Sequence, residues 1–101
     1  MQIKRVGLVG AGAIGAYFIY YMQKALGDDF LVLAEGDRLA RLQSRGIVIN
    51  GVQTPVHAVS FADAGTVDLL IIATKYGALK QAAQQSRAVC GEHTVFLSVL
   101  N

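Results

Sequence analysis

Continuous apolar runs of strand length alternate with helically spaced apolar positions along the whole chain. The runs are nearly solid, as in strands buried on both faces of a parallel sheet, whereas the spaced positions recur every three or four residues. Strands are predicted over residues 3–9, 30–34, 69–73 and 94–100, and helices over residues 13–26, 38–45 and 78–87. This alternation predicts an α/β fold: a Rossmann-type, doubly wound, mainly parallel sheet in a single domain, residues 1–101.

Turn residues predict the helix ends and one less regular segment. Gly27 and Gly46 are expected to stop the first two helices, and Asp37 is expected to cap the second. Two weaker apolar runs, residues 47–49 and 56–59, are separated by residues typical of turns. We expect these two runs to form an edge or hairpin pair.

A glycine-rich turn joins the first strand to the first helix with the spacing of a dinucleotide fingerprint. Its six residues are Gly10, Ala11, Gly12, Ala13, Ile14 and Gly15. In this setting Gly10 makes the tight turn, Gly12 lets the backbone approach a pyrophosphate, and Gly15 allows close packing of helix on strand. Phosphate oxygens would meet free N–H groups and the positive end of the helix dipole. The alternative is a turn that only connects a strand to a helix.

Further candidate residues follow the later strands, at the rim where doubly wound sheets bind their ligands. Glu35 lies 20 positions after the last glycine of the turn, where a carboxylate can accept hydrogen bonds from adenosine ribose hydroxyls, which favours NAD. Arg38 is the opposing signal, since a guanidinium there can pair with the 2′-phosphate of NADP. Thr74, Lys75 and Asn101 are expected at the same rim. The alternative is a set of solvated surface side chains.

Composition narrows the class of protein and its partners. The apolar fraction of 53% exceeds the usual 45–50% or so, which fits a buried sheet and leaves room for surface covered by another domain or by a second copy in a homodimer. The net charge of +2 comes from scattered basic residues, so no nucleic acid is expected. With a single cysteine and no cluster of zinc ligands, neither a disulfide nor a metal site is expected, and a reducing cytoplasm fits best.

The apolar run from Val6 to Met22 has the charge pattern of a membrane anchor or signal peptide. Four glycines interrupt it, and its length is at the short end for spanning a bilayer. We therefore expect no membrane association and assign the run to a strand, a turn and a helix.

Four motifs occur in an order and spacing more specific than the glycine turn alone. They are residues 9–18, Gly36-Asp37-Arg38-Leu39 with Leu42 and Gly46-Ile47, Ala73-Thr74-Lys75, and residues 97–101. Together they resemble the N-terminal domain of the ketopantoate reductase (2-dehydropantoate 2-reductase) family over essentially the whole chain. The resemblance implies hydride transfer from NADPH to the ketone of 2-ketopantoate, a small 2-keto acid, giving pantoate on the route to pantothenate and coenzyme A.

The resemblance also assigns roles to individual residues. The three glycines match the family's pyrophosphate loop, Lys75 matches a lysine near cofactor and substrate, and Asn101 matches the asparagine of a Gln-Asn-Gly turn. Two positions depart from the family pattern: Glu35 stands where arginine is common, and Leu100 where glutamine is usual. The cofactor implied by the family is therefore NADP, whereas Glu35 favours NAD.

The family places its general-acid lysine and the groups that hold the substrate in a helical C-terminal domain that these 101 residues do not include. We therefore expect no catalytic residue within this chain, and expect it alone to bind dinucleotide weakly without turning over ketopantoate. Two other functions fit the same glycine turn: a non-enzymatic, NAD-binding regulatory module, and a Rossmann enzyme domain that uses FAD or S-adenosylmethionine.

Overall fold

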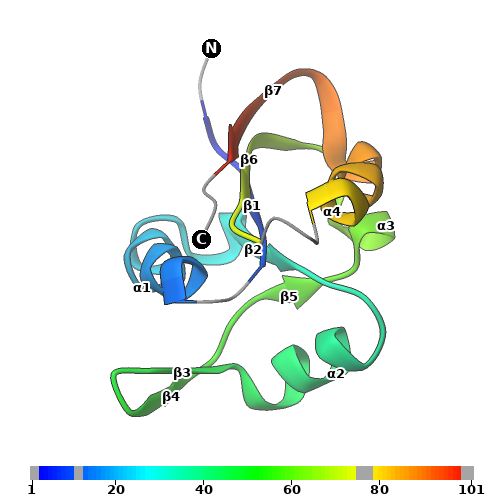
Figure 1. The fold of residues 1–101 in the computed structure, drawn as a ribbon. Helices are drawn as coiled ribbons and strands as arrows, with labels where there is room; N and C mark the ends of the chain where they lie inside the picture. Colours follow the sequence, from blue (N-terminus) through cyan, green and yellow to red (C-terminus); the bar gives the residue numbers. More distant parts are fainter. Residues whose placement is uncertain (1–2, 11–12, 75–78, 99–101) are drawn as a thin grey trace.

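A five-stranded parallel sheet forms the centre of the molecule (Figure 1). The structure, a computed structural model, describes residues 3–10, 13–74 and 79–98, apart from the side chains of residues 13–15 and 79. The strands are β1 (Val6–Val9), β2 (Phe30–Leu33), β5 (Ala58–Val59), β6 (Val67–Ile72) and β7 (Cys90–Ser98). Their order is β5-β2-β1-β6-β7, and every neighbouring pair is parallel. The chain builds outward from β1 in both directions, so the predicted doubly wound α/β fold is confirmed.

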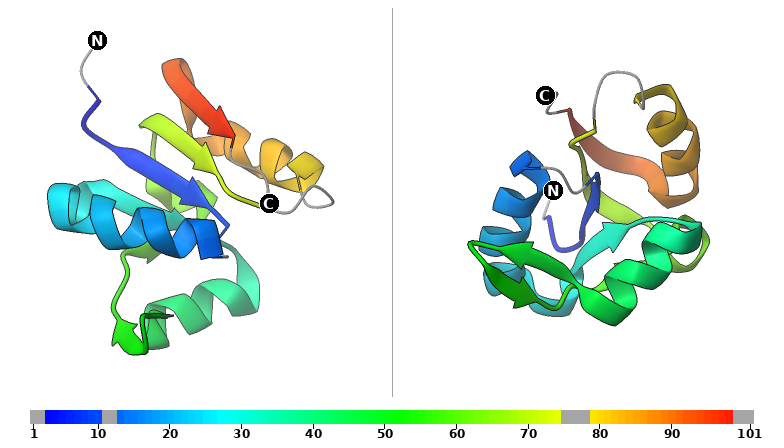
Figure 2. Two further views of the ribbon diagram at one scale, coloured as in Figure 1. Left: turned by 60° about the vertical axis from the view of Figure 1, so that its left-hand side comes forward. Right: turned by 60° about the horizontal axis from the view of Figure 1, so that its bottom comes forward.

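Helices cover both faces of the sheet (Figures 1 and 2). On one face lie α1 (Ala13–Leu26) and α2 (Gly36–Arg45), and on the other lie α3 (Phe61–Ala64) and α4 (Leu79–Ser86). Two short 3-10 turns, η1 (Gly27–Asp29) and η3 (Arg87–Val89), lead from α1 and α4 into the next strands. This arrangement leaves the carboxyl ends of the strands open at one edge.

Alternate side chains of the strands enter different hydrophobic cores. Val6 and Leu8 of β1 pack beneath α1 and α2, whereas Val9 packs beneath α3 and α4. The largest fully buried side chains include Phe30, Leu8, Ile19, Leu31, Leu70 and Ile71. Because β1, β2 and β6 are buried on both faces, these three strands carry apolar residues at almost every position, whereas the edge strand β7 is largely exposed.

The segment between α2 and β6 differs from the prediction. Residues 47–49 form β3 (Ile47–Ile49), but the hairpin partner is β4 (Val52–Thr54), and the predicted pairing with residues 56–59 is wrong. Asn50 and Gly51 both have positive φ, as a two-residue hairpin turn requires, so the nearer segment pairs. The later run instead supplies β5, a parallel edge strand beside β2.

Glycines end the first two helices as predicted. α1 stops at Leu26, directly before Gly27, and the Gly46 N–H, at φ +66°, donates to Leu42 O at 2.9 Å.

The predicted cap at Asp37 is wrong, because α2 already begins at Gly36 and Asp37 lies in its first turn. The N-cap position belongs to Glu35, whose side chain makes no capping bond to α2.

Within the described parts of the chain, every helix is too short or too polar to cross a membrane.

Candidate functional site

The strand order reverses between β1 and β6, and the carboxyl ends of these two strands lie against each other. The Ala73 N–H donates to Val9 O at 2.8 Å, which carries the pairing one residue past β6. Gly10 follows with φ +95°, and a Cβ built there would lie only 2.5 Å from Ala73 O. Glycine is therefore needed at position 10 both for its backbone conformation and for this close approach.

A cavity of about 230 Å³ opens at this point, and we call it the rim cavity. Its apolar lining comes from Val9, Leu33, Ala34, Phe61 and Ala82. Its polar lining comes from Glu35, Arg38, Thr74, Gln81 and Gln85, with Gly10 at the turn. An apolar floor with a few convergent polar groups is the usual composition of a small-molecule site.

Glu35 is held in this lining by a contact from a distant part of the sequence. Its Oε1 accepts a hydrogen bond from the Phe61 N–H at 3.0 Å, across 26 positions of sequence. Phe61 is only 4% exposed, so its backbone is anchored by the core, and Ser60 caps the same turn by accepting from the Asp63 N–H at 3.1 Å. The carboxylate therefore joins the end of β2 to the start of α3.

Three further polar side chains line the cavity, one from the segment after β6 and two from α4. Thr74 Oγ1 is buried and has no hydrogen-bond partner among the described residues. Gln81 and Gln85, one turn apart on α4, present amides that can both donate and accept. A buried hydroxyl without a partner is costly, so Thr74 is a natural contact for a polar ligand.

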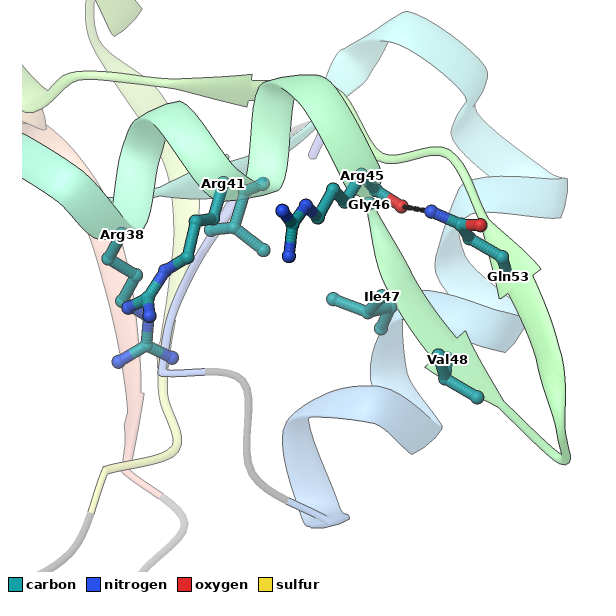
Figure 3. A pocket seen from close by; sticks show the side chains of 8 residues that line it. Arg38, Arg41, Arg45, Gly46, Ile47, Val48 and Gln53 are labelled. Carbon is teal, nitrogen blue, oxygen red and sulfur yellow. Dashed lines mark hydrogen bonds between the residues drawn. The ribbon is translucent and has the colours of Figure 1, made fainter.

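A second, basic cavity of about 490 Å³ lies beside the first, between α2 and the β3–β4 hairpin. Arg38, Arg41 and Arg45 project from one side of α2 into it, and we call them the arginine face (Figure 3). Arg38 also lines the rim cavity, so the two cavities share a wall. No ion pair joins the arginine face to any acidic side chain in the described part of the chain. The guanidinium groups are thus free to attract an anion.

Known proteins resemble this chain over nearly its full length. The sequence model of the family described as ketopantoate reductase PanE/ApbA matches residues 6–101. The chain belongs to this family. It is 29% identical to the 2-dehydropantoate 2-reductase of Mesorhizobium japonicum and 30% identical to that of Streptococcus pyogenes serotype M1. These alignments cover 96% and 95% of this chain but 31% and 33% of the relatives, so the chain spans about a third of their length.

Solved structures of similar proteins share the fold of this chain. A protein of Ralstonia solanacearum MolK2, provisionally assigned as a ketopantoate reductase, superposes with a TM-score of 0.80 at 30% identity, over 99% of this chain and 32% of that one. D-mandelate dehydrogenase, solved with NADH and anilino(oxo)acetate, superposes with a TM-score of 0.78 over 96% of this chain and 33% of that one. At 24% identity the second likeness shows the fold alone.

The structure brings four of the predicted site residues of this ketopantoate reductase family member together. The four that line the rim cavity are Gly10, Glu35, Arg38 and Thr74. Three others, at the start of α1, are Ala13, Ile14 and Gly15, for which the structure describes the backbone only. The remaining four, Ala11, Gly12, Lys75 and Asn101, lie outside the described residues.

Sequence reasoning did not assign the apolar lining of the rim cavity to the site, nor its two glutamines. Gln81 and Gln85 are spaced by four on a helix that follows a central strand, and this polar pair was a usable signal. Phe61 had no such signal, because α3 is only four residues long and its contact with Glu35 is tertiary.

Other reactive groups lie away from this rim. Burial raises the pKa of the Cys90 thiol, so this side chain stays protonated and is a weak nucleophile at neutral pH. Among the described residues there is no group of three or more histidine, cysteine, aspartate or glutamate side chains that could hold a metal ion.

Proposed function

We propose that this chain is the cofactor-binding part of an oxidoreductase that uses a nicotinamide dinucleotide to reduce 2-ketopantoate to pantoate, in pantothenate and coenzyme A biosynthesis. The observation that carries the proposal is the rim cavity, which lies at the β1–β6 switch point directly beside the glycine turn in a member of the ketopantoate reductase family. The D-mandelate dehydrogenase with the same fold binds NADH, which supports a cofactor of this class.

The residues present fit one part of such a cofactor. At about 230 Å³ the rim cavity is smaller than the 300–1,000 Å³ or so of complete ligand sites, so it suits the adenosine half. The apolar floor can take the adenine ring, and Thr74 Oγ1, lacking a partner among the described residues, offers it or the ribose a hydrogen bond. The pyrophosphate would then lie on residues 10–15, at the start of α1.

When bound, the cofactor supplies the hydride, and the residues of this chain hold and orient it. Gly10 keeps the turn tight, Glu35 and Thr74 fix the ribose end, and the arginine face attracts the phosphates. Lys75 and Asn101 are assigned by family resemblance to the nicotinamide and substrate end. Proton donation to the ketone is assigned to the helical domain of the longer relatives.

The proposed setting is the cytoplasm, and the proposed assembly is a homodimer. A ketopantoate reductase of Staphylococcus aureus described as dimeric superposes with a TM-score of 0.71 at 19% identity, which supports this arrangement through the fold alone. Exposed apolar side chains of β7 offer a surface for it, with Val95, Phe96 and Leu97 exposed by 40%, 58% and 42%.

A ligand titration of the 101-residue chain tests the cofactor class. The chain has no tryptophan, so the fluorescence of NADH and NADPH can be followed against little protein background while FAD and S-adenosylmethionine compete. We expect a reduced nicotinamide cofactor to bind and the other two to fail to displace it. Gly12→Val should lower that affinity more than tenfold, because the new side chain takes the place of the pyrophosphate.

The control is Ala40→Val on α2, because Ala40 is exposed and lines neither the rim cavity nor the basic cavity. It should bind like the unmodified chain. Tighter binding of FAD or S-adenosylmethionine, or full affinity in a folded Gly12→Val variant, would contradict the proposed cofactor site.

A further inference from the structure

The geometry around Glu35 bears on whether this chain binds NAD(H) or NADP(H). We propose that Glu35, held in place by the Phe61 amide, makes the site selective for NAD(H) over NADP(H). This inference rests on the proposed function, because it concerns the same adenosine site. The family resemblance implies NADP. The inference differs because Glu35 stands where arginine is common in the family.

Glu35 is fixed from two directions. At its backbone, the neighbouring Ala34 N–H donates to Val59 O at 3.2 Å, which joins the end of β2 to β5. At its side chain, Oε1 accepts from the Phe61 N–H at 3.0 Å. Phe61 itself is buried in the core beneath α3 and α4. Glu35 is exposed, and the hydrogen bond from the Phe61 N–H is the contact that directs its carboxylate to the rim cavity.

The fixed carboxylate still has acceptor capacity for a ligand. Oε1 uses one of its lone pairs on the Phe61 N–H, and Oε2 has no hydrogen-bond partner among the described residues. An ionised carboxylate only accepts hydrogen bonds, so it matches the two donor hydroxyls of an unmodified ribose. A 2′-phosphate offers acceptor oxygens and negative charge at the same place, and a held carboxylate repels it.

The arginine face opposes this selection through one residue. Arg41 and Arg45 are exposed and line the basic cavity beside the hairpin and not the rim cavity (Figure 3), so their charges attract the phosphates that both cofactors carry. Arg38 lines both cavities and can pair with a 2′-phosphate, which favours NADP(H). The proposal is that repulsion from the Glu35 carboxylate at the ribose position outweighs this attraction.

The dissociation constants of NADH and NADPH for the unmodified chain and four variants test whether Glu35 sets the cofactor preference. We expect NADH to bind the unmodified chain at least tenfold more tightly than NADPH does. Glu35→Gln should weaken the binding of NADH by about tenfold and bring the ratio of the two dissociation constants close to one. Glu35→Arg should reverse the preference. Arg41→Gln, which removes a charge outside the rim cavity, should weaken the binding of both cofactors by a similar factor and leave the ratio unchanged.

Asp37→Asn is the matched control, because it removes the same charge two positions away, from an exposed side chain outside the rim cavity. It should leave the ratio unchanged. Gln retains an acceptor oxygen for the Phe61 N–H, so an unchanged amide shift of Phe61 in Glu35→Gln shows that the turn is intact. Tighter NADPH binding by the unmodified chain, or an unchanged ratio in Glu35→Gln, would overturn the inference. Failure of both cofactors to bind would instead refute the proposed function.

Discussion

Single residues at the rim are constrained by the protein itself as much as by a ligand. Gly10 is the clearest case, since its φ of +95° and the approach of Ala73 O exclude a side chain before any cofactor is considered. The sequence predicted a glycine for a tight turn at this position. The contact with β6, 63 positions later in the chain, is a second reason that only the folded structure reveals.

Gly10→Ala should lower the free energy of unfolding by at least about 2 kcal/mol, because it combines an unfavourable φ with a backbone clash. Gly27→Ala is the control: its φ of +58° is also positive, but an added Cβ meets no atom within 4 Å. There we expect a loss of about 1 kcal/mol. Urea unfolding of both variants measures the difference, and equal losses would show that the close approach does not matter.

Glu35 illustrates how far a residue can be interpreted from sequence. Its distance from the glycine turn placed it at the correct rim, beside Gly10 and Thr74. Its bond to the Phe61 N–H could not be predicted, because that donor belongs to a four-residue helix with no periodicity of its own.

At the scale of elements, polar contacts tie the start of β1 to the start of β6. Asp68 Oδ2 accepts from the N–H groups of Lys4 and Arg5, both at 2.9 Å, and the Asp68 N–H donates to Arg5 O at 2.8 Å. The Arg5 guanidinium donates to Thr66 O at 3.1 Å and to Ala64 O at 2.6 Å. This clamp at the amino ends of the two central strands lies opposite the rim cavity.

Hydrogen bonds from the backbone N–H groups of Arg5 and Lys4 hold the pKa of the Asp68 carboxyl below the ordinary range of an aspartate. A lowered folded-state pKa means that the contribution to stability is complete above the unfolded pKa and is lost as the pH falls through the folded value. Asp68→Asn should therefore be less stable than the unmodified chain at pH 7, and the two should converge as the pH falls through the lowered pKa of Asp68.

Denaturant unfolding between pH 7 and pH 2 measures this convergence. Asp29→Asn is the control, since Asp29 is an exposed carboxylate for which the described residues provide no hydrogen-bond donor. It should follow the unmodified chain across the range. A constant gap between Asp68→Asn and the unmodified chain at all pH values would refute the clamp.

The elements that were predicted correctly are those with long, uniform patterns. The helix at residues 13–26 and the strands β1, β2 and β6 were found because their apolar residues recur along the chain, and β7 was found through its apolar residues 95–97. The β3–β4 hairpin and β5 were mispaired because strands of two or three residues carry too little pattern, and pairing was decided by the positive φ of Asn50 and Gly51.

At the scale of the whole molecule, the order of strands is what creates the site. Winding outward from β1 leaves a gap between the connections on the two faces, and the rim cavity lies there. The sequence predicted this architecture, and four of the residues that it placed at this edge line the rim cavity. The balance between Glu35 and the arginine face depends on side-chain positions, so sequence alone left the cofactor open.

The central claim is that the rim cavity binds the adenosine half of a nicotinamide dinucleotide, and amide chemical shifts recorded by NMR during an NADH titration test it most directly. We predict that the shifts change at Gly10, Glu35, Arg38, Thr74 and Gln85, and stay constant at the opposite edge, around Asp68. Changes confined to other surfaces, or no changes at saturating NADH, would contradict the account.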